Sequence, residues 1–152
     1  MSKPFETLTL ADAKRMLNAG EAEAGKFAIP YNIAVVDAGG HLLSFTRQDG
    51  AMTGCIDLAI NKAYTACAFH QPTHVLGELA QPAAELFGIQ HSNAGKIVIF
   101  GGGIPIRRNS AVIGAIGASA GTVAQDIAVA TAALGALEPS IMEIPATLID
   151  RS

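Results

Sequence analysis

The clearest hydrophobic period in the chain lies between residues 9 and 27. Small or apolar side chains recur there at alternating spacings of three and four, which marks one face of a helix. These positions are Leu10, Ala13, Leu17, Gly20, Ala24 and Phe27. Thr9 and Asp12 form a capping-box pattern at the start, and Pro30 terminates the helical stretch. We therefore expect a first helix over residues 9–27.

Two β-rich runs follow, Tyr31–Ala38 and His41–Gln48. Only Gly39 and Gly40 separate them, and glycine readily adopts the positive φ that a tight hairpin turn requires. These runs predict a β-hairpin. Residues 55–69 then contain no Gly or Pro and are rich in Ala and Ile, which predicts a mostly buried helix. A polar stripe runs along this helix at spacing four, formed by Asp57, Asn61 and Thr65, with Lys62 beside it.

The two cysteines, Cys55 and Cys67, lie on this same predicted helix, twelve residues apart. A helical rise of 1.5 Å per residue separates them by about 18 Å. That distance is too long for a disulfide within one chain. We expect two buried, inert thiols.

The second half of the chain predicts a short helix near 74–80, an irregular stretch, and then three strands in a meander. The strands are Lys96–Phe100, Ile104–Arg107 and Ala111–Ala118. Thr122 can cap a last helix, whose apolar positions are Val123, Ile127, Ala130, Leu134 and Leu137. The order α-β-β-α-β-β-β-α with short strand connections predicts an α+β fold, a five-stranded antiparallel sheet flanked by helices. We expect one domain over 1–138 and an apolar tail, 139–152, docked on it or on a neighbouring subunit.

Composition points to self-association. Only 15% of the residues are charged and 50% are hydrophobic, so part of the surface is expected to be buried between identical subunits; the alternative is a large hydrophobic core within one subunit. The formal charge of −3 and the absence of a Lys/Arg run argue against a nucleic-acid partner. The sequence contains no uninterrupted run of about 20 apolar residues, so we expect no membrane-spanning helix. The first residues lack a signal-peptide pattern, so we expect a cytoplasmic protein.

No common catalytic signature is present. The chain lacks a Gly-x-Ser-x-Gly elbow and a His-Glu-x-x-His zinc helix, and Gly101–Gly103 does not have the dinucleotide-binding spacing. The four histidines are scattered. His70 and His74 do have spacing four, but Pro72 interrupts a continuous helical face between them. We predict no metal site.

Four glycine-rich corners carry the remaining polar candidates, and their convergence would form a pocket for a small molecule. They are Asp37–His41, Arg47–Ala51, Gly101–Arg107 and Ser119–Thr122. Glycine permits close approach of the backbone to a ligand, and a helix start offers free amides to an anion. The predicted ligand-binding residues from these corners are Arg47, Gly102, Gly103, Arg107, Gly121 and Thr122. Alternatively, each glycine only shapes a turn, and Asp126 only complements the helix dipole.

The charged candidates also have two interpretations each. The planar fork of Arg47 or Arg107 suits a carboxylate, whereas an Arg–Asp pair would instead brace the loop. If desolvation lowers the pKa of Lys62, this amine becomes reactive. Alternatively, Lys62 has only a structural role. His41 or Asp49 is the candidate general base.

Several of these motifs together resemble the GlcG/HbpS-like haem-binding family, which includes the C-terminal domain of PduO-type proteins. The motifs are Val35–Leu43, Asp49–Ala51, Ile56–Ala63, Gly101–Ile106, Val112–Gly117, Gly121-Thr122 and Gln125-Asp126. The resemblance runs from about residue 7 to 138. It implies a profilin-like fold and dimers that assemble into tetramers or octamers. It also makes haem a possible cofactor, with an iron ligand on the first helix. The first helix here, Thr9–Phe27, contains no histidine, which leaves His41, His70, His74 or Met52 as substitutes.

Three functions agree with these observations. The first is an oligomeric accessory protein that binds haem or a corrinoid in an apolar pocket, with an arginine meeting its propionates or amides. The second is a cofactor-independent catabolic enzyme, an isomerase, lyase or hydrolase acting on a small organic acid through His41, Asp49 or Lys62. The third is a structural partner of an operon enzyme, with residues 139–152 as the interface.

Overall fold

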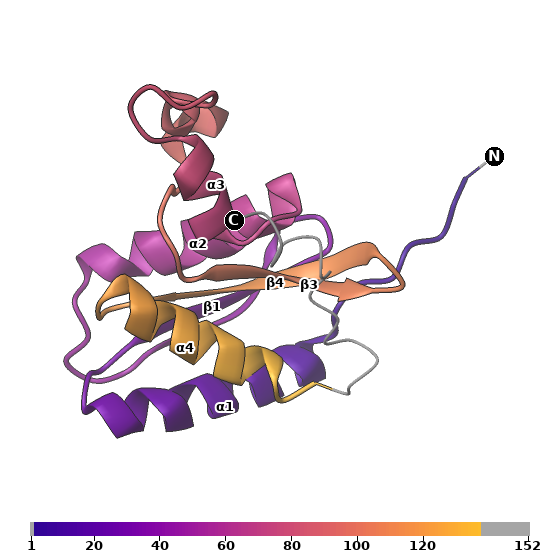
Figure 1. Ribbon diagram of the computed structural model, residues 1–152. Coiled ribbons are helices and arrows are strands. Elements are labelled where there is room, and N and C mark those ends of the chain that lie inside the picture. The colour runs from indigo at the N-terminus through magenta and orange to yellow at the C-terminus, as the bar shows by residue number, and fades with distance from the viewer. Residues whose placement is uncertain (1, 138–152) are drawn as a thin grey trace.

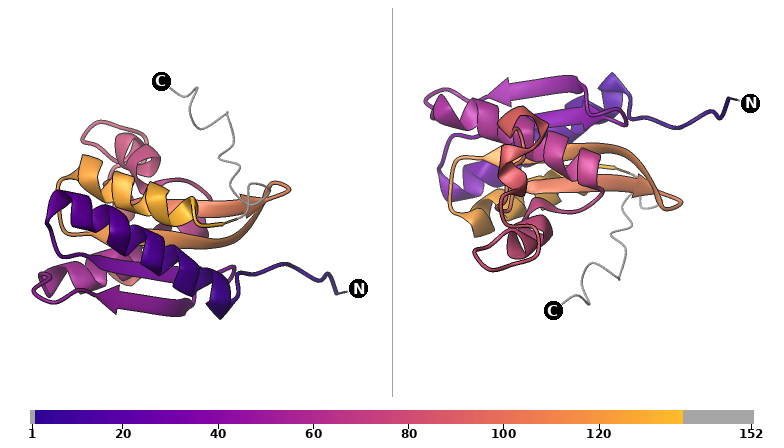
Figure 2. Two further views of the ribbon diagram at one scale, coloured as in Figure 1. Left: turned by 90° about the horizontal axis from the view of Figure 1, so that it is seen from below. Right: turned by 90° about the horizontal axis from the view of Figure 1, so that it is seen from above.

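A computed structural model describes residues 2–137 of the chain, and it forms a sheet covered by helices on both faces (Figure 1). The elements in order are α1 (Leu10–Phe27), β1 (Asn32–Asp37), β2 (Leu42–Arg47), α2 (Gly54–Phe69), α3 (Thr73–Leu79), the short 3-10 turns η1 (Ile89–His91) and η2 (Asn93–Gly95), β3 (Gly103–Arg108), β4 (Ala111–Ser119) and α4 (Val123–Leu134). α1 and α4 lie side by side on one face, and α2 lies on the other, as the turned views also show (Figure 2). The predicted α+β class, an antiparallel sheet flanked by helices, is confirmed. The predicted docking of residues 139–152 lies outside the described residues.

The sheet has four strands within residues 2–137, in the order β2-β1-β4-β3, and every neighbouring pair is antiparallel. The prediction of five strands is wrong, because residues 96–100 do not join the sheet. The Val98 amide donates to the Thr65 hydroxyl of α2 at 3.0 Å instead of to a neighbouring strand. Ile97 and Val98 are buried, so their apolar side chains produced a strand-like pattern without strand pairing. The profilin-like designation, which came from the resemblance alone, stays a prediction.

Alternation along β1 divides the interior into two layers. Ile33 and Val35 face α1 and α4 and belong to a core of large side chains, whereas Ala34 and Val36 face α2. The layer against α2 contains mostly alanine: Ala34, Ala59, Ala63, Ala66 and Ala115, together with Val36 and Cys67. Because these side chains are small, α2 can approach the sheet closely.

Two sheet glycines allow that approach. A Cβ atom at Gly117 would overlap the Ala59 carbonyl and lie 2.6 Å from the Ala63 nitrogen, both on α2. A Cβ atom at Gly103 would likewise overlap the Lys62 carbonyl. These glycines are therefore required for the packing of one helix against the sheet.

The first three predicted helices and the hairpin are confirmed within one or two residues, whereas α4 ends at Leu134, before Leu137, which was predicted to lie on the same helix. Thr9 caps α1, and its hydroxyl accepts from the Asp12 amide at 3.2 Å while the Asp12 carboxylate accepts from the Thr9 amide at 3.0 Å. Cys55 and Cys67 are both free, the first half-buried and the second buried. Within residues 2–137, no helix is both long and apolar enough to cross a bilayer. The same part of the chain contains no grouping of three or more His, Cys, Asp or Glu side chains that would hold a metal ion.

Candidate functional site

The start of α4 is a capping box. The Thr122 hydroxyl accepts from the Gln125 amide at 3.2 Å, and the Gln125 side-chain oxygen accepts from the Thr122 amide at 2.9 Å. This reciprocal pair satisfies two backbone donors that a helix start otherwise leaves without a partner. The cap that was predicted at Thr122 is confirmed, and it positions Asp126 on the first turn of the helix, facing the sheet.

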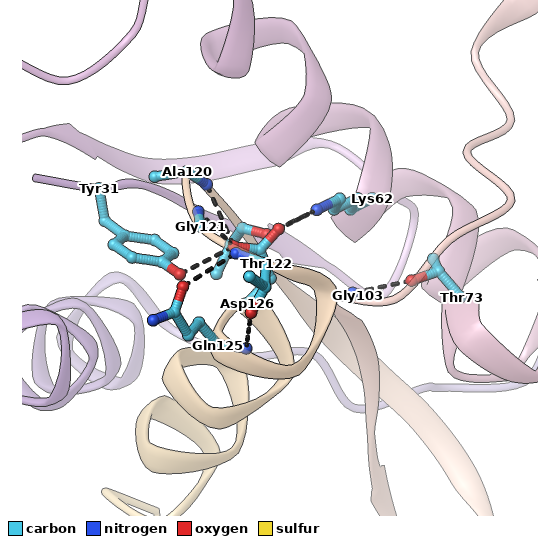
Figure 3. Close-up of polar contacts among 10 residues, drawn as sticks. Tyr31, Lys62, Thr73, Gly103, Ala120, Gly121, Thr122, Gln125 and Asp126 are labelled. Carbon is cyan, nitrogen blue, oxygen red and sulfur yellow. Dashed lines mark hydrogen bonds and ion pairs between the residues drawn. The ribbon is translucent and has the colours of Figure 1, made fainter. Parts of the chain in front are cut away.

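The Asp126 carboxylate is the centre of a buried polar network (Figure 3). Its Oδ1 accepts from the Tyr31 hydroxyl at 2.8 Å and from the amides of Ala120 and Gly121 at 3.1 and 3.0 Å. Its Oδ2 accepts from the Lys62 Nζ at 2.7 Å. Asp126 is only 3% exposed. The amides of Ala120 and Gly121, just before this helix start, therefore bind a carboxylate of the chain itself.

Lys62 is completely buried between α2 and the sheet, and so is Thr65 of the polar stripe that was predicted beside it. Its ammonium also donates to the Ala118 carbonyl at 3.0 Å, and the centre of the Phe100 ring lies 5.0 Å away. Burial lowers the pKa of Lys62, while the hydrogen bond and charge of Asp126 oppose that shift. Burial and the same carboxylate raise the pKa of the Tyr31 hydroxyl above its ordinary value of 10.

The neighbouring glycines complete this enclosure. A Cβ atom at Gly102 would lie 2.8 Å from the Lys62 Nζ, and the backbone there has φ +127, which glycine adopts readily. The Gly103 amide donates to the Thr73 hydroxyl at 2.9 Å (Figure 3). A Cβ atom at Gly121 would lie 2.7 Å from the Tyr31 hydroxyl. The chain's own atoms occupy the space beside all three glycines that were predicted to bind a ligand.

Three of the four glycine-rich corners lie at one end of the sheet. Asn32 pairs with Arg47 on one side and with Ser119 on the other, and Gly103 pairs with Gly117. The corners at 47–51, 101–103 and 119–122 therefore lie at this end. The β1–β2 turn at 37–41 lies at the opposite end, as does Arg107.

This arrangement separates the candidate general bases. Because β2 is an extended strand of six residues, His41 and Asp49, which flank it, are at least about 17 Å apart along the strand direction. The His41 side chain is 83% exposed, and its Nδ1 lies 3.5 Å from Asp37 Oδ1. Asp49 and Arg47 are also exposed, and none of the ion pairs found in residues 2–137 includes either of them. The alternative of an Arg47–Asp49 brace is therefore not seen.

Arg107 connects β3 to α2. Its Nη2 donates to the His70 carbonyl, and its Nη1 donates to the Ser110 carbonyl at 3.3 Å. His70 is the C-terminal cap of α2 and has a left-handed backbone with φ 57. Arg107 thus fixes the end of a helix against the β3–β4 turn.

Sequence reasoning did not find the network as a unit. It assigned Tyr31 only to a strand, offered Asp126 as a complement to a helix dipole, and considered Lys62 alone. The available signal was a single charged residue, Asp126, in the last helix and a single cationic residue, Lys62, in the Ala-rich helix over 55–69. Buried charges are nearly always paired, so this pattern favours a contact between the two side chains.

Two clefts of about 270 Å³ each open elsewhere on the described surface. The first, which we call the arm cleft, lies between the N-terminal residues and the β3–β4 hairpin and includes Phe5, Glu6, Arg108 and Val112. The second, which we call the helix-end cleft, lies at the C-terminal end of α1 and includes Ala28, Pro30 and Asp49. Neither cleft includes a residue of the buried network.

Comparison with known proteins identifies the family. The family model described as "Haem degrading protein HbpS-like" matches residues 8–135. The chain is 47% identical over 133 residues to the uncharacterized 15.0 kDa protein in the dhaT-dhaS intergenic region of Citrobacter freundii, covering 88% of this chain and 94% of that protein. The crystal structure of Klebsiella pneumoniae protein ORFY matches with a TM-score of 0.87 and 41% identity, covering 90% of this chain and 97% of that one. The crystal structure of the PduOC:haem complex matches with a TM-score of 0.85 and 33% identity, covering 90% and 99%. The resemblance inferred from the motifs is confirmed, and the chain belongs to the HbpS-like family.

Proposed function

We propose that this protein is an oligomeric accessory protein that binds a tetrapyrrole, either haem or a corrinoid. The observation that carries the proposal is the match to PduOC, a protein solved in complex with haem, which extends over 90% of this chain at 33% identity. The low content of charged residues supports an assembly of several copies. The cytoplasmic location and the oligomeric state remain predictions.

The size and lining of the two clefts bear on how such a ligand would be held. Each cleft has a volume of about 270 Å³, slightly below the range of about 300–1,000 Å³ typical of ligand pockets. None of the residues that line them is a histidine, cysteine or methionine, and α1 contains no histidine either. These two clefts, in the part of the chain that the structure describes, therefore do not fit an enclosed haem whose iron has a protein ligand.

Binding between copies of the chain removes this difficulty. Large apolar side chains are exposed on the described surface: Phe5, Leu10, Leu42, Met52, Phe87, Phe100 and Val123. Such side chains provide contact area for a flat, apolar ring once a second subunit covers it. Recognition in this form depends on the ring and its side chains, and it does not require iron ligation.

A titration with three ligands tests the proposal. Hemin, metal-free protoporphyrin IX and cobalamin are each added to the purified protein and followed by absorbance, with the oligomer size measured by light scattering. We expect saturation by at least one ligand at a fixed number per oligomer. We also expect similar affinities for hemin and protoporphyrin IX. If none of the three ligands gives a saturable change, the proposal is wrong, and a strict requirement for iron would contradict recognition by the ring.

The placement of the candidate bases does not support the alternative of an enzyme. His41 and Asp49 lie near opposite ends of β2, and Lys62 is buried with its ammonium engaged. A general base must be within hydrogen-bond reach of the proton that it removes. The third alternative, a structural partner of an operon enzyme, depends on residues 139–152 and stays a hypothesis.

A further inference from the structure

The N-terminal residues are anchored along β4 before α1 begins. The Leu8 amide donates to the Ile113 carbonyl at 2.9 Å, and the Leu8 side chain is 2% exposed. The Thr7 hydroxyl accepts from the Ala38 amide at 2.9 Å. Residues 4–6 continue from this anchor past the end of the β3–β4 hairpin, and both lie at the same end of the molecule (Figure 1). The arm cleft is the space between them.

The walls of the arm cleft are mostly apolar. Ile113 is buried, Val112 is half-buried, and Phe5 at the cleft has 79% of its surface exposed. A phenylalanine that contributes little to the core and borders a cleft offers a surface for an apolar ligand. The polar groups in the same cleft are the side chains of Glu6, Arg108 and Asn109.

The Arg108 guanidinium is only partly engaged by the other described residues. Its Nη1 donates to the Glu6 carboxylate at 2.9 Å, whereas its Nε is buried and has no hydrogen-bond partner among the described residues. The Glu6 side chain is 56% exposed and belongs to the arm. A guanidinium can bind a carboxylate through two parallel hydrogen bonds, but Glu6 makes only one. Glu6 is thus a carboxylate of the chain that an incoming carboxylate can replace.

We propose that the arm cleft is a binding site for a small apolar monocarboxylate, an aliphatic or aromatic acid. The carboxylate of the ligand takes the place of Glu6 on Arg108, and the amide of Asn109 can donate to its second oxygen. The apolar part of the ligand covers Phe5 and Val112. The volume of about 270 Å³ sets the size of a small acid. This site is separate from the tetrapyrrole proposal and does not depend on it.

Charge selects a monocarboxylate over a dicarboxylate. Arg108 is the one cationic side chain among the described residues that line the cleft, and Glu6 remains close by after it is displaced. A second carboxylate on the ligand would face Glu6 without a cation of its own, and like charges at short range repel. Hexanoate should therefore bind more tightly than adipate, which has the same number of carbon atoms.

The test is a titration of the full chain with sodium hexanoate, followed by NMR of the Arg108 Nε–H and the backbone amides of 110–113. We expect saturable shifts at these groups and no comparable shifts with hexanamide, the neutral analogue. Arg108→Gln should weaken binding at least tenfold. Arg15→Gln, which changes an exposed arginine of α1 that does not line the cleft, is the control and should leave the affinity unchanged.

Glu6→Gln should change the affinity for hexanoate in the opposite direction from Arg108→Gln. Because it removes the competing carboxylate, it should tighten hexanoate binding several-fold, and it remains informative if the Arg108 variant fails to fold. The proposal is overturned if the wild-type chain shows no saturable shift at Arg108, if hexanamide binds as well as hexanoate, or if Glu6→Gln weakens binding. Hexanoate binding together with no saturable change from hemin, protoporphyrin IX or cobalamin would reject the tetrapyrrole proposal alone.

Discussion

Replacing Asp126 with asparagine should cost more stability than replacing its partner Lys62 with methionine. In the asparagine variant, the retained Oδ1 still accepts from Tyr31, Ala120 and Gly121, but an amide nitrogen now faces the Lys62 ammonium. Lys62 is 0% exposed, so its charge has neither water nor a carboxylate. In the methionine variant, Asp126 keeps three of its four donors.

The magnitudes follow from that asymmetry. Leaving a buried charge without its partner costs about 3–5 kcal/mol. The buried lysine can instead lose its proton, which for an ordinary lysine at pH 7 costs about 4.6 kcal/mol. The loss of stability in Asp126→Asn therefore cannot greatly exceed this value. Lys62→Met removes a charged hydrogen-bond donor from a carboxylate that remains well satisfied, so we expect about 1.5–3 kcal/mol.

The two variants should also differ in their dependence on pH. Burial lowers the pKa of Lys62 in the native chain, and Asp126→Asn removes the charge that opposes this shift. Between the lowered folded pKa and the unfolded value near 10.5, the unfolded chain binds one proton more, so stability rises with pH. The asparagine variant should regain up to about 2.7 kcal/mol between pH 7 and 9, whereas the methionine variant lacks this group and shows no such gain.

Urea unfolding monitored by circular dichroism at pH 7 and 9 measures both effects. Asp49→Asn, at an exposed position, is the control and should change stability by less than about 0.5 kcal/mol. Equal losses for Asp126→Asn and Lys62→Met, with the same dependence on pH, would refute the assignment of an unpaired buried ammonium.

Three further substitutions test other parts of the structure. Gly117→Ala should destabilise the protein by about 1–3 kcal/mol or more in thermal unfolding, since its Cβ would overlap the Ala59 carbonyl. Gly25→Ala should instead stabilise it by about 0.5–1 kcal/mol, because alanine favours the helix α1 and its Cβ would have no atom within 4 Å. The raised pKa of Tyr31 gives a stabilising contribution that is complete below pH 10 and declines as the pH rises above 10. Tyr31→Phe should lack that decline in urea titrations at pH 9 and 11, and an unchanged slope would contradict the burial of the hydroxyl. Thr122→Ala should cost about 0.5–2 kcal/mol, and a normal melting temperature would exclude a functional cap.

Local pattern was a sufficient guide wherever one element determines its own conformation. The capping boxes at Thr9 and Thr122 and the glycine pair at 39–40 specify helix starts and a turn through contacts between residues close in sequence. Residues 96–100 show where this guide fails. Their apolar side chains are buried as a strand's would be, but the backbone partner is Thr65, on a helix about thirty residues earlier. No local pattern distinguishes a strand that pairs from an extended segment that packs on a helix.

The sequence by itself determined the class of the fold, the positions of the helices and the family, because these depend on local periodicity, capping and linear motifs. Only the tertiary structure decided the role of the polar residues. Asp126 and Lys62 are 64 residues apart, and only the packing of α2 and α4 on opposite faces of the sheet, with glycines between, brings them to 2.7 Å. The space beside the glycines that motif reasoning assigned to a ligand is instead occupied by Lys62, Tyr31 and the backbone of α2. A glycine motif in the sequence shows that another group can come close to the backbone. The packing of distant elements determines whether that group is a ligand or a side chain of the protein itself.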